Sequence, residues 1–308
     1  MTVPTGRVLV TGADGFVGRH VCRRFAEGGW AVLGTRRAGP SELSGGVEYR
    51  STGDIAALPD WRPLLEGAAV VVHTAGRAHD RATGAGEQVL EACRRVNVEA
   101  TVHLARSAAA SGVRRFIHVG SLLVEGAGAM PRHRPYVMSK REAEEALAGL
   151  AAGTRMDIVI LRPPLVYGPG VAANFALLLD AVRRGWPLPL ASVDNRRSFI
   201  FVDNLADAIA TAAGHPAPLA GTFPISDGET VAVPELVRRI ARAMGREPRL
   251  LPCPHALLRT LGSMAGQGER VESLCASLVA DDRPFRQATG WSPPFTLDQG
   301  LAATVREL

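Results

Sequence analysis

The sequence of 308 residues predicts an α/β protein: a doubly wound parallel sheet with a smaller C-terminal lobe. Three observations predict this fold class. Short apolar runs alternate with helical patterns through the first half of the chain, the runs are apolar at nearly every position, and a glycine-rich turn joins the first run to the first helix. Continuous apolar strands are typical of parallel sheets because helices cover both of their faces.

Six strands are expected in the first half. They cover residues 7–11, 31–35, 47–50, 69–73, 115–119 and 157–161. The 3.6-residue spacing of apolar positions predicts helices between them, at about 15–27, along 89–111 and around Tyr136. Further helices are expected at 233–244 and 255–264.

The regular alternation ends after Gly170, where prolines become frequent. We therefore expect one domain formed by residues 1–170 together with about 196–216, and a substrate-binding lobe formed by residues 171–195 and 217–308. Open α/β sheets bind ligands at the carboxyl ends of their strands. The smaller lobe is expected to cover that edge.

Composition narrows the possible partners. The net charge is +5, but the arginines are scattered in pairs and aromatic residues make up only 5% of the chain, so we expect no nucleic-acid partner. The four cysteines lack metal-type spacing, which predicts free thiols and no metal site.

No apolar run is long enough for a membrane span, and no secretion signal is expected at the N-terminus. These features predict a cytoplasmic protein without a membrane partner.

The turn after the first strand reads Thr11-Gly12-Ala13-Asp14-Gly15-Phe16-Val17-Gly18. Three glycines at this spacing allow a tight turn, close approach of the backbone to a pyrophosphate, and close packing of helix on strand. The N-terminus of the following helix favours the phosphates. The turn therefore predicts a dinucleotide site in a Rossmann domain, bound by Gly12, Gly15, Phe16, Val17 and Gly18.

The end of the second strand bears on which dinucleotide binds. An acidic residue there would contact the ribose 2′-hydroxyl of NAD, but the chain reads Gly34-Thr35-Arg36-Arg37. Two guanidinium groups favour the 2′-phosphate of NADP, so NADP is expected and NAD remains possible. Asp54 and Ile55 are expected near the adenine, and Thr74, Ala75 and Gly76 beneath the cofactor.

Lys140 is the only lysine in a chain that otherwise uses arginine for its fixed positive charge. It lies four residues after Tyr136, so the two side chains share a helix face. A nearby ammonium stabilises a phenolate, and we expect the pKa of Tyr136 to fall from about 10 towards neutral. A phenol of that kind can donate or accept a proton at working pH.

Seven motifs in order resemble the extended short-chain dehydrogenase/reductase family, in its nucleotide-sugar epimerase, dehydratase and 4-ketoreductase branch. The resemblance covers nearly the whole chain. The motifs are Gly12-x-x-Gly15-x-x-Gly18, His73-Thr74-Ala75-Gly76, Asn97, Ser121, Tyr136-x-x-x-Lys140, Leu161-Arg162-Pro163-Pro164-Leu165-Val166-Tyr167-Gly168-Pro169 and Arg197-Ser198-Phe199-Ile200-Phe201-Val202-Asp203-Asn204.

The resemblance implies roles for these residues. Tyr136 would be the general acid/base, Lys140 would hold the nicotinamide ribose and lower the Tyr136 pKa, and Ser121 would hydrogen-bond the substrate oxygen. Pro163 would lie in the segment that closes over the nicotinamide. Further residues implied in substrate binding are Arg77, His79, Asn174, Arg197 and Arg270, with Arg197 at a nucleotide diphosphate.

The residues after Ser121 are Leu122 and Leu123, where the family's dehydratases carry acids, so dehydration is excluded. A 4-keto reductase of a nucleotide-sugar is favoured, because the missing acid and the arginine pair suit NADPH. A UDP-sugar 4-epimerase is the alternative, followed by a reductase or dehydrogenase of another small carbonyl substrate and by a non-catalytic NADP-binding sensor. The resemblance also implies a homodimer.

Overall fold

The computed structural model describes residues 6–77, 86–126, 134–264, 266 and 268–308. Within these residues, an eight-stranded sheet has the order β10-β7-β6-β5-β1-β2-β4-β3. Its strands are β1 (Arg7–Thr11), β2 (Ala31–Arg36), β3 (Glu42–Ser44), β4 (Val47–Ser51), β5 (Ala68–His73), β6 (Arg115–Val119), β7 (Asp157–Arg162) and β10 (Gly221–Pro224). All neighbouring pairs are parallel except β3 and β4.

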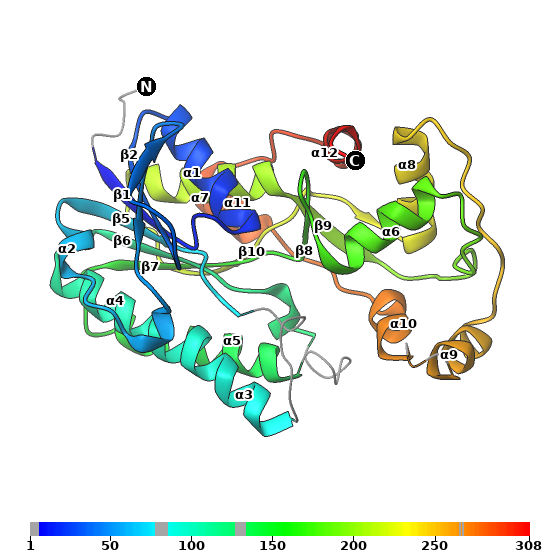
Figure 1. Cartoon of the computed structure of the whole chain (residues 1–308), viewed down its shortest axis with the longest axis horizontal. Coiled ribbons are helices and arrows are strands. Elements are labelled where there is room, and N and C mark those ends of the chain that lie inside the picture. Colours follow the sequence, from blue (N-terminus) through cyan, green and yellow to red (C-terminus); the bar gives the residue numbers. More distant parts are fainter. Residues whose placement is uncertain (1–5, 78–85, 127–133, 265, 267) are drawn as a thin grey trace.

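Helices cover both faces of this sheet (Figure 1). On one face lie α2 (Arg62–Leu65), α3 (Gly86–Arg94), α4 (Ala100–Ala110) and α5 (Arg134–Ala151); on the other lie α1 (Phe16–Glu27), α7 (Val202–Gly214) and α11 (Arg283–Thr289). Successive strand residues point to opposite faces. Leu9 therefore packs in one core and its neighbours Val8 and Val10 in the other, which explains why β1 is apolar throughout.

The predicted fold class is confirmed, and all six expected strands are present with ends shifted by one residue at most. Helices α8 (Val233–Ala243) and α9 (His255–Met264) match the two expected in the last third. The long helix expected at 89–111 is instead divided by a π-helical segment, η3 (Arg95–Glu99), between α3 and α4.

The second unit contains a three-stranded sheet, β11-β9-β8. Its strands are β8 (Leu165–Tyr167), β9 (Arg197–Phe201) and β11 (Thr230–Val231). Around them lie α8, α9, α6 (Ala173–Arg183), α10 (Gly268–Cys275) and α12 (Leu297–Arg306). Phe175, Phe199 and Leu236 are buried in the core that joins these elements.

The packing differs from the expected domain boundary at residue 217. Strand β10 pairs with β7 and so belongs to the large sheet. Phe285 and Trp291 are buried in the same core as the first strands, with their rings 5.6 Å apart. The prolines between residues 216 and 224 obscured β10, and Pro224 is tolerated because this strand lies at the sheet edge.

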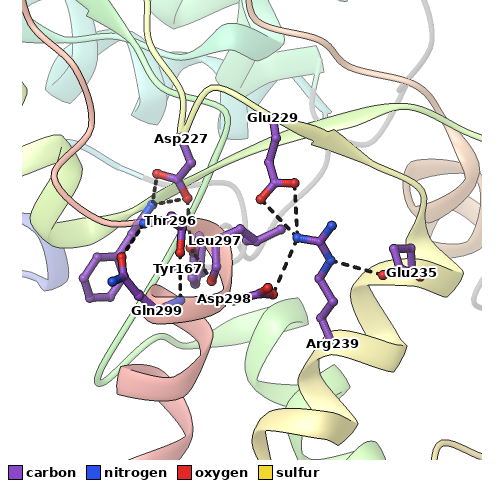
Figure 2. Close-up of polar contacts among 10 residues, drawn as sticks. Tyr167, Asp227, Glu229, Glu235, Arg239, Thr296, Leu297, Asp298 and Gln299 are labelled. Carbon is purple, nitrogen blue, oxygen red and sulfur yellow. Dashed lines mark hydrogen bonds and ion pairs between the residues drawn. The ribbon is translucent and has the colours of Figure 1, made fainter.

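A buried carboxylate joins the two sheets. Asp227 accepts hydrogen bonds from the Tyr167 hydroxyl at 2.8 Å, from the Phe201 backbone N–H at 2.9 Å and from Asn204 Nδ2 at 2.7 Å. Figure 2 shows this cluster beside a second one, in which Arg239 donates to Glu229, Glu235 and Asp298. Both clusters connect α12 to the segment before α8. Asn204 also ties the Asp227 cluster to α7, which packs on the large sheet.

Candidate active site

The glycine-rich turn lies between β1 and α1. Gly12 has φ +68°, and a Cβ at this position would come within 2.9 Å of the backbone of Ala75. A Cβ at Gly18 would lie 2.0 Å from the Gly12 carbonyl oxygen. Only glycine fits either position, and the turn leaves backbone N–H groups at the start of α1 open to a phosphate.

A cavity of about 390 Å³ opens beside this turn at the carboxyl ends of the strands. It is lined by eight of the residues expected to bind the cofactor: Gly12, Gly15, Arg36, Arg37, Ile55, Thr74, Ala75 and Gly76. The turn and the cavity together fit a dinucleotide, with the pyrophosphate at the helix N-terminus and the adenosine half towards β2.

The two arginines after β2 differ. Arg36 donates to Glu42 Oε1 at 3.0 Å and to the Pro40 carbonyl, and its guanidinium lies 5.1 Å from the centre of the Tyr49 ring. Arg37 is exposed at the cavity. Arg36 is therefore pre-ordered, while Arg37 is accessible to a ligand.

Seven other expected cofactor residues do not line this cavity: Phe16, Val17, Gly18, Asp54, Tyr136, Lys140 and Pro163. Phe16 and Val17 lie on the first turn of α1 and are half-buried, with the Phe16 ring edge-on to His20. Asp54 caps a short 3₁₀ turn by accepting from the Ala56 N–H at 3.1 Å. Pro163 is buried just after β7, and its carbonyl accepts from Leu122 N–H at 2.9 Å.

The three residues predicted to be catalytic come from two neighbouring elements. Ser121 follows β6, is 8% exposed, and its hydroxyl influences the pKa of Tyr136 through a hydrogen bond. Tyr136 lies in the first turn of α5, and Lys140 lies one turn later. The Lys140 ammonium donates to the Val119 carbonyl at 2.9 Å, two residues before Ser121.

The expected fall in the Tyr136 pKa is not what the structure shows. Burial is the largest influence and raises the pKa, and the Ser121 hydrogen bond only partly opposes it. The Lys140 ammonium is directed at Val119, and burial lowers its own pKa to about 8. The phenol of Tyr136 is therefore protonated at neutral pH and suited to proton donation.

Two buried histidines lie beneath Lys140. His73 is hydrogen-bonded through both ring nitrogens, to the hydroxyls of Thr11 at 2.7 Å and Thr101 at 2.9 Å. The His118 ring is stacked on it at 5.5 Å, and neither His118 nitrogen has a partner among the described residues. Burial, and then the charge of Lys140, lowers the pKa of both, so both rings are neutral.

Asn97 lies within the π-helical segment η3. Its Oδ1 accepts from the Arg77 backbone N–H at 2.8 Å, and its Nδ2 donates to the Arg77 carbonyl at 3.2 Å and to Ser139 Oγ at 2.9 Å. The Asn97 side chain is buried, and it joins the loop after β5 to Ser139 on α5.

A second cavity, of about 370 Å³, lies in the smaller unit and is lined by Asn174 and Arg197. Arg197 is 8% exposed, and its guanidinium donates to the carbonyls of Ser273 and Ala276. Burial lowers its pKa. The rest of the lining is mostly apolar, including Leu165, Phe175, Leu178, Leu190, Phe199, Val233, Leu236, Leu258 and Leu274.

The remaining expected substrate residues are placed less fully. Arg77 follows β5, with its backbone held by Asn97. His79 lies outside the described residues. Arg270 lies within α10, but its side chain is also outside what the structure describes.

Glu144 was not named in the sequence-based prediction, and Arg162 was named only within the Leu161–Pro169 motif, yet the two side chains meet next to the candidate site. Arg162 donates to Glu144 Oε2 through Nε at 2.9 Å and through Nη2 at 2.6 Å. The spacing of Glu144, four residues after Lys140, was the available signal.

Within the described part of the chain, no group of three His, Cys, Asp or Glu side chains could hold a metal ion. No helix found there is long and apolar enough to span a membrane.

Comparison with known proteins places these features in a family. A sequence model of the "NAD dependent epimerase/dehydratase family" matches residues 8–224. The chain is 36% identical to a UDP-glucose 4-epimerase of Vibrio cholerae, with 97% of this chain and 94% of the relative covered. It is 32% identical to a ceramide reductase of Caulobacter vibrioides, with 97% and 93% covered.

Solved structures agree on the fold. The UDP-glucuronic acid 4-epimerase of Bacillus cereus in complex with NAD has a TM-score of 0.77 at 20% identity, with 98% of this chain and 96% of that chain covered. The chain therefore belongs to the NAD-dependent epimerase/dehydratase family, of the extended short-chain dehydrogenase/reductase type, and is an enzyme that uses a nicotinamide dinucleotide.

Proposed function

We propose that the protein is a 4-keto reductase of a nucleotide-sugar, with NADPH as the preferred reductant. The observation that carries this choice is the end of β2, where Thr35, Arg36 and Arg37 line the cofactor cavity without a carboxylate among them. Guanidinium groups suit a 2′-phosphate, and the cofactor that carries it is the usual reductant in biosynthetic reductions.

The residues of the site support the reductive direction. When bound, the nicotinamide supplies hydride to the carbonyl carbon. Tyr136, protonated at neutral pH, donates its proton to the oxygen that becomes a hydroxyl, and Ser121 hydrogen-bonds the same oxygen and fixes its position. The ammonium of Lys140, next to Gly76, holds the ribose side of the site.

The smaller unit supplies the residues proposed to bind the substrate. Arg197 is a buried cation without an anionic partner among the described residues, and it faces an apolar cavity. An anionic group entering that cavity would neutralise the Arg197 guanidinium, and the diphosphate of a nucleotide-sugar is such a group. Asn174 lies on the same wall.

A UDP-sugar 4-epimerase is the second candidate, favoured by the 36% identity to the Vibrio cholerae enzyme. Epimerisation begins by removing a proton from a hydroxyl and ends by returning one, so Tyr136 would act first as base and then as acid. The apolar lining of the second cavity and the 32% identity to a ceramide reductase support reduction of a non-sugar carbonyl as the third.

The test is a substrate panel with the purified protein. We expect a UDP- or dTDP-4-keto sugar to be reduced with stoichiometric oxidation of NADPH. Interconversion of UDP-glucose and UDP-galactose without net change of cofactor would replace the reductase by the epimerase. Oxidation of NADPH by long-chain ketones alone would favour the third candidate.

The cofactor preference has its own test. Replacing Arg36 and Arg37 together by Ala should weaken NADPH binding by about 10-fold or more, since about 1.4 kcal/mol is lost for each factor of ten, and should leave NADH binding within a few-fold. The measurement is the dissociation constant of each cofactor by calorimetry. Equal weakening of both would show that neither guanidinium contacts a 2′-phosphate.

We also propose a homodimer, formed through the long helices α4 and α5, as in related folds. Light scattering of the purified chain would test it, and a monomeric mass at micromolar concentration would contradict it.

A further inference from the structure

Glu144 lies one helical turn beyond Lys140 on α5, and the two side chains share the buried face of the helix. Lys140 is 5% exposed and Glu144 is 4% exposed. The Glu144 Oε2 atom accepts both hydrogen bonds from Arg162. Its Oε1 atom is buried and has no hydrogen-bond partner among the described residues. Half of this carboxylate is therefore unused by the ion pair.

The unused oxygen lies against the turn that holds the catalytic groups. A Cβ added to Gly120 would be 2.4 Å from Glu144 Oε1. Gly120 connects Val119, whose carbonyl accepts from the Lys140 ammonium, to Ser121. Burial raises the pKa of Glu144, while Arg162, the Lys140 ammonium and the Ser121 backbone N–H lower it. These groups therefore all face the carboxylate.

The other groups around Lys140 supply no negative charge. His73 on β5 and His118 on β6 are neutral, and the phenol of Tyr136 is protonated. Burial lowers the pKa of Lys140 to about 8, and Glu144 is the group that raises it. A buried ammonium with no anion nearby would lose its proton near neutral pH.

We propose that Glu144 is a positioning residue of the active site, whose carboxylate keeps the Lys140 amine protonated and directed at Val119 beneath Ser121. The inference rests on the proposed roles of Tyr136 and Lys140 in the reaction. Glu144 touches no reacting atom, and acts on the site through Lys140 and the Gly120 turn.

A purely structural reading assigns Glu144 only to the ion pair with Arg162. The two readings differ in what Lys140 does when the charge of Glu144 is removed. If Glu144 only joins α5 to β7, its loss changes stability and leaves the titration of Lys140 unchanged. If it acts on Lys140, the titration shifts.

Because Lys140 is the only lysine, the full-length protein labelled with ¹³C at the lysine ε-carbon gives one lysine resonance. The experiment follows that resonance against pH in the unsubstituted protein, in Glu144→Gln and in Glu142→Gln. Glu142 is a matched control, because it lies on the same helix but forms an exposed ion pair with Arg94. The unsubstituted protein should give a pKa of about 8.

In Glu144→Gln the Lys140 pKa should fall by about one unit or more, the low end of the effect of a nearby opposite charge. Glu142→Gln should leave it unchanged. A Glu144→Gln protein that is folded by circular dichroism and titrates as the unsubstituted protein does would overturn the proposal.

If Glu144→Gln alone does not fold, the double variant Glu144→Gln/Arg162→Gln removes the ion pair without leaving a lone buried charge. Arg162 is not among the groups that shift the Lys140 pKa, so the same fall is expected. An unshifted resonance in the folded double variant would also overturn the proposal. The titration needs no substrate, so a wrong choice of reaction would show in the substrate panel and leave this result unaffected.

Discussion

Two buried carboxylates in this molecule, Asp227 and Glu144, have similar exposure and different surroundings. They are 8% and 4% exposed, and burial raises the pKa of both. Asp227 accepts hydrogen bonds on both oxygens, from the Tyr167 hydroxyl (Figure 2), from the Phe201 N–H and from Asn204 Nδ2. Glu144 accepts through one oxygen from Arg162, and its second oxygen has no hydrogen-bond partner within the described ranges.

The difference separates a structural carboxylate from one near the active site. A buried carboxylate costs the fold less free energy when its hydrogen-bonding capacity is filled than when one oxygen is left without a donor. Asp227 meets this condition at the junction of the two sheets. Glu144 does not, and its unused oxygen lies against Gly120, beside the atoms expected to perform catalysis. For these two carboxylates, the unfilled oxygen distinguishes the one beside the candidate site, whereas burial does not.

The largest expected effect on stability is that of Asp227→Ala. Three buried donors would lose their acceptor, which should reduce the free energy of unfolding by about 3–5 kcal/mol. Urea unfolding measures this loss. Glu229→Ala, which removes a half-exposed partner of Arg239 on the same segment, should cost about 1 kcal/mol or less. Equal losses in the two variants would show that the Asp227 cluster is not the structural junction.

The second effect concerns pH. Burial raises the pKa of Asp227 from 3.8 to about 6, so the folded state holds this proton more tightly than the unfolded state. The stabilisation of the folded state by this protonated carboxyl group is fully present below about pH 4 and is lost as pH rises through about 6. The total loss is up to about 3 kcal/mol. Asp227→Asn removes the titration. Between about pH 4 and 7, the free energy of unfolding of the unsubstituted protein should therefore fall relative to that of Asp227→Asn. A difference between the two proteins that stays constant over this range would contradict the raised pKa.

A smaller loss of stability than that of Asp227→Ala is expected for Gly120→Ala. The added methyl group must displace Glu144 Oε1, which is the end of a flexible side chain, and should cost about 1–2 kcal/mol. The same variant should shift the Lys140 resonance, because the carboxylate moves. If Gly120→Ala reduces stability but leaves the Lys140 titration unchanged, Glu144 is a structural carboxylate like Asp227.

The sequence predicted the elements whose signal is local. The six strands follow from continuous apolar runs, and the glycine turn follows from Gly12 and Gly18, which no other residue could replace. The spacing of Tyr136 and Lys140 placed both on α5. These features depend on short stretches of chain, so their position in the fold could be predicted.

Features set by contacts between distant segments were missed. Strand β10 lies in a proline-rich stretch, and only its pairing with β7 identifies it. The π-helical turn contains Asn97, which binds the distant backbone of Arg77. The helical spacing of Tyr136 and Lys140 alone predicted a lowered Tyr136 pKa. Burial instead raises this pKa, and the Lys140 ammonium is directed towards the Val119 carbonyl.

The central claim is that Tyr136 donates the proton in a reduction at this site, and Tyr136→Phe tests it most directly. In rapid mixing of the NADPH-loaded enzyme with a nucleotide 4-keto sugar, hydride transfer in the variant should slow by about 100-fold or more, the usual contribution of a general acid. The dissociation constant of NADPH should change little, since only the hydroxyl is lost. A variant that transfers hydride at nearly the full rate would contradict the account.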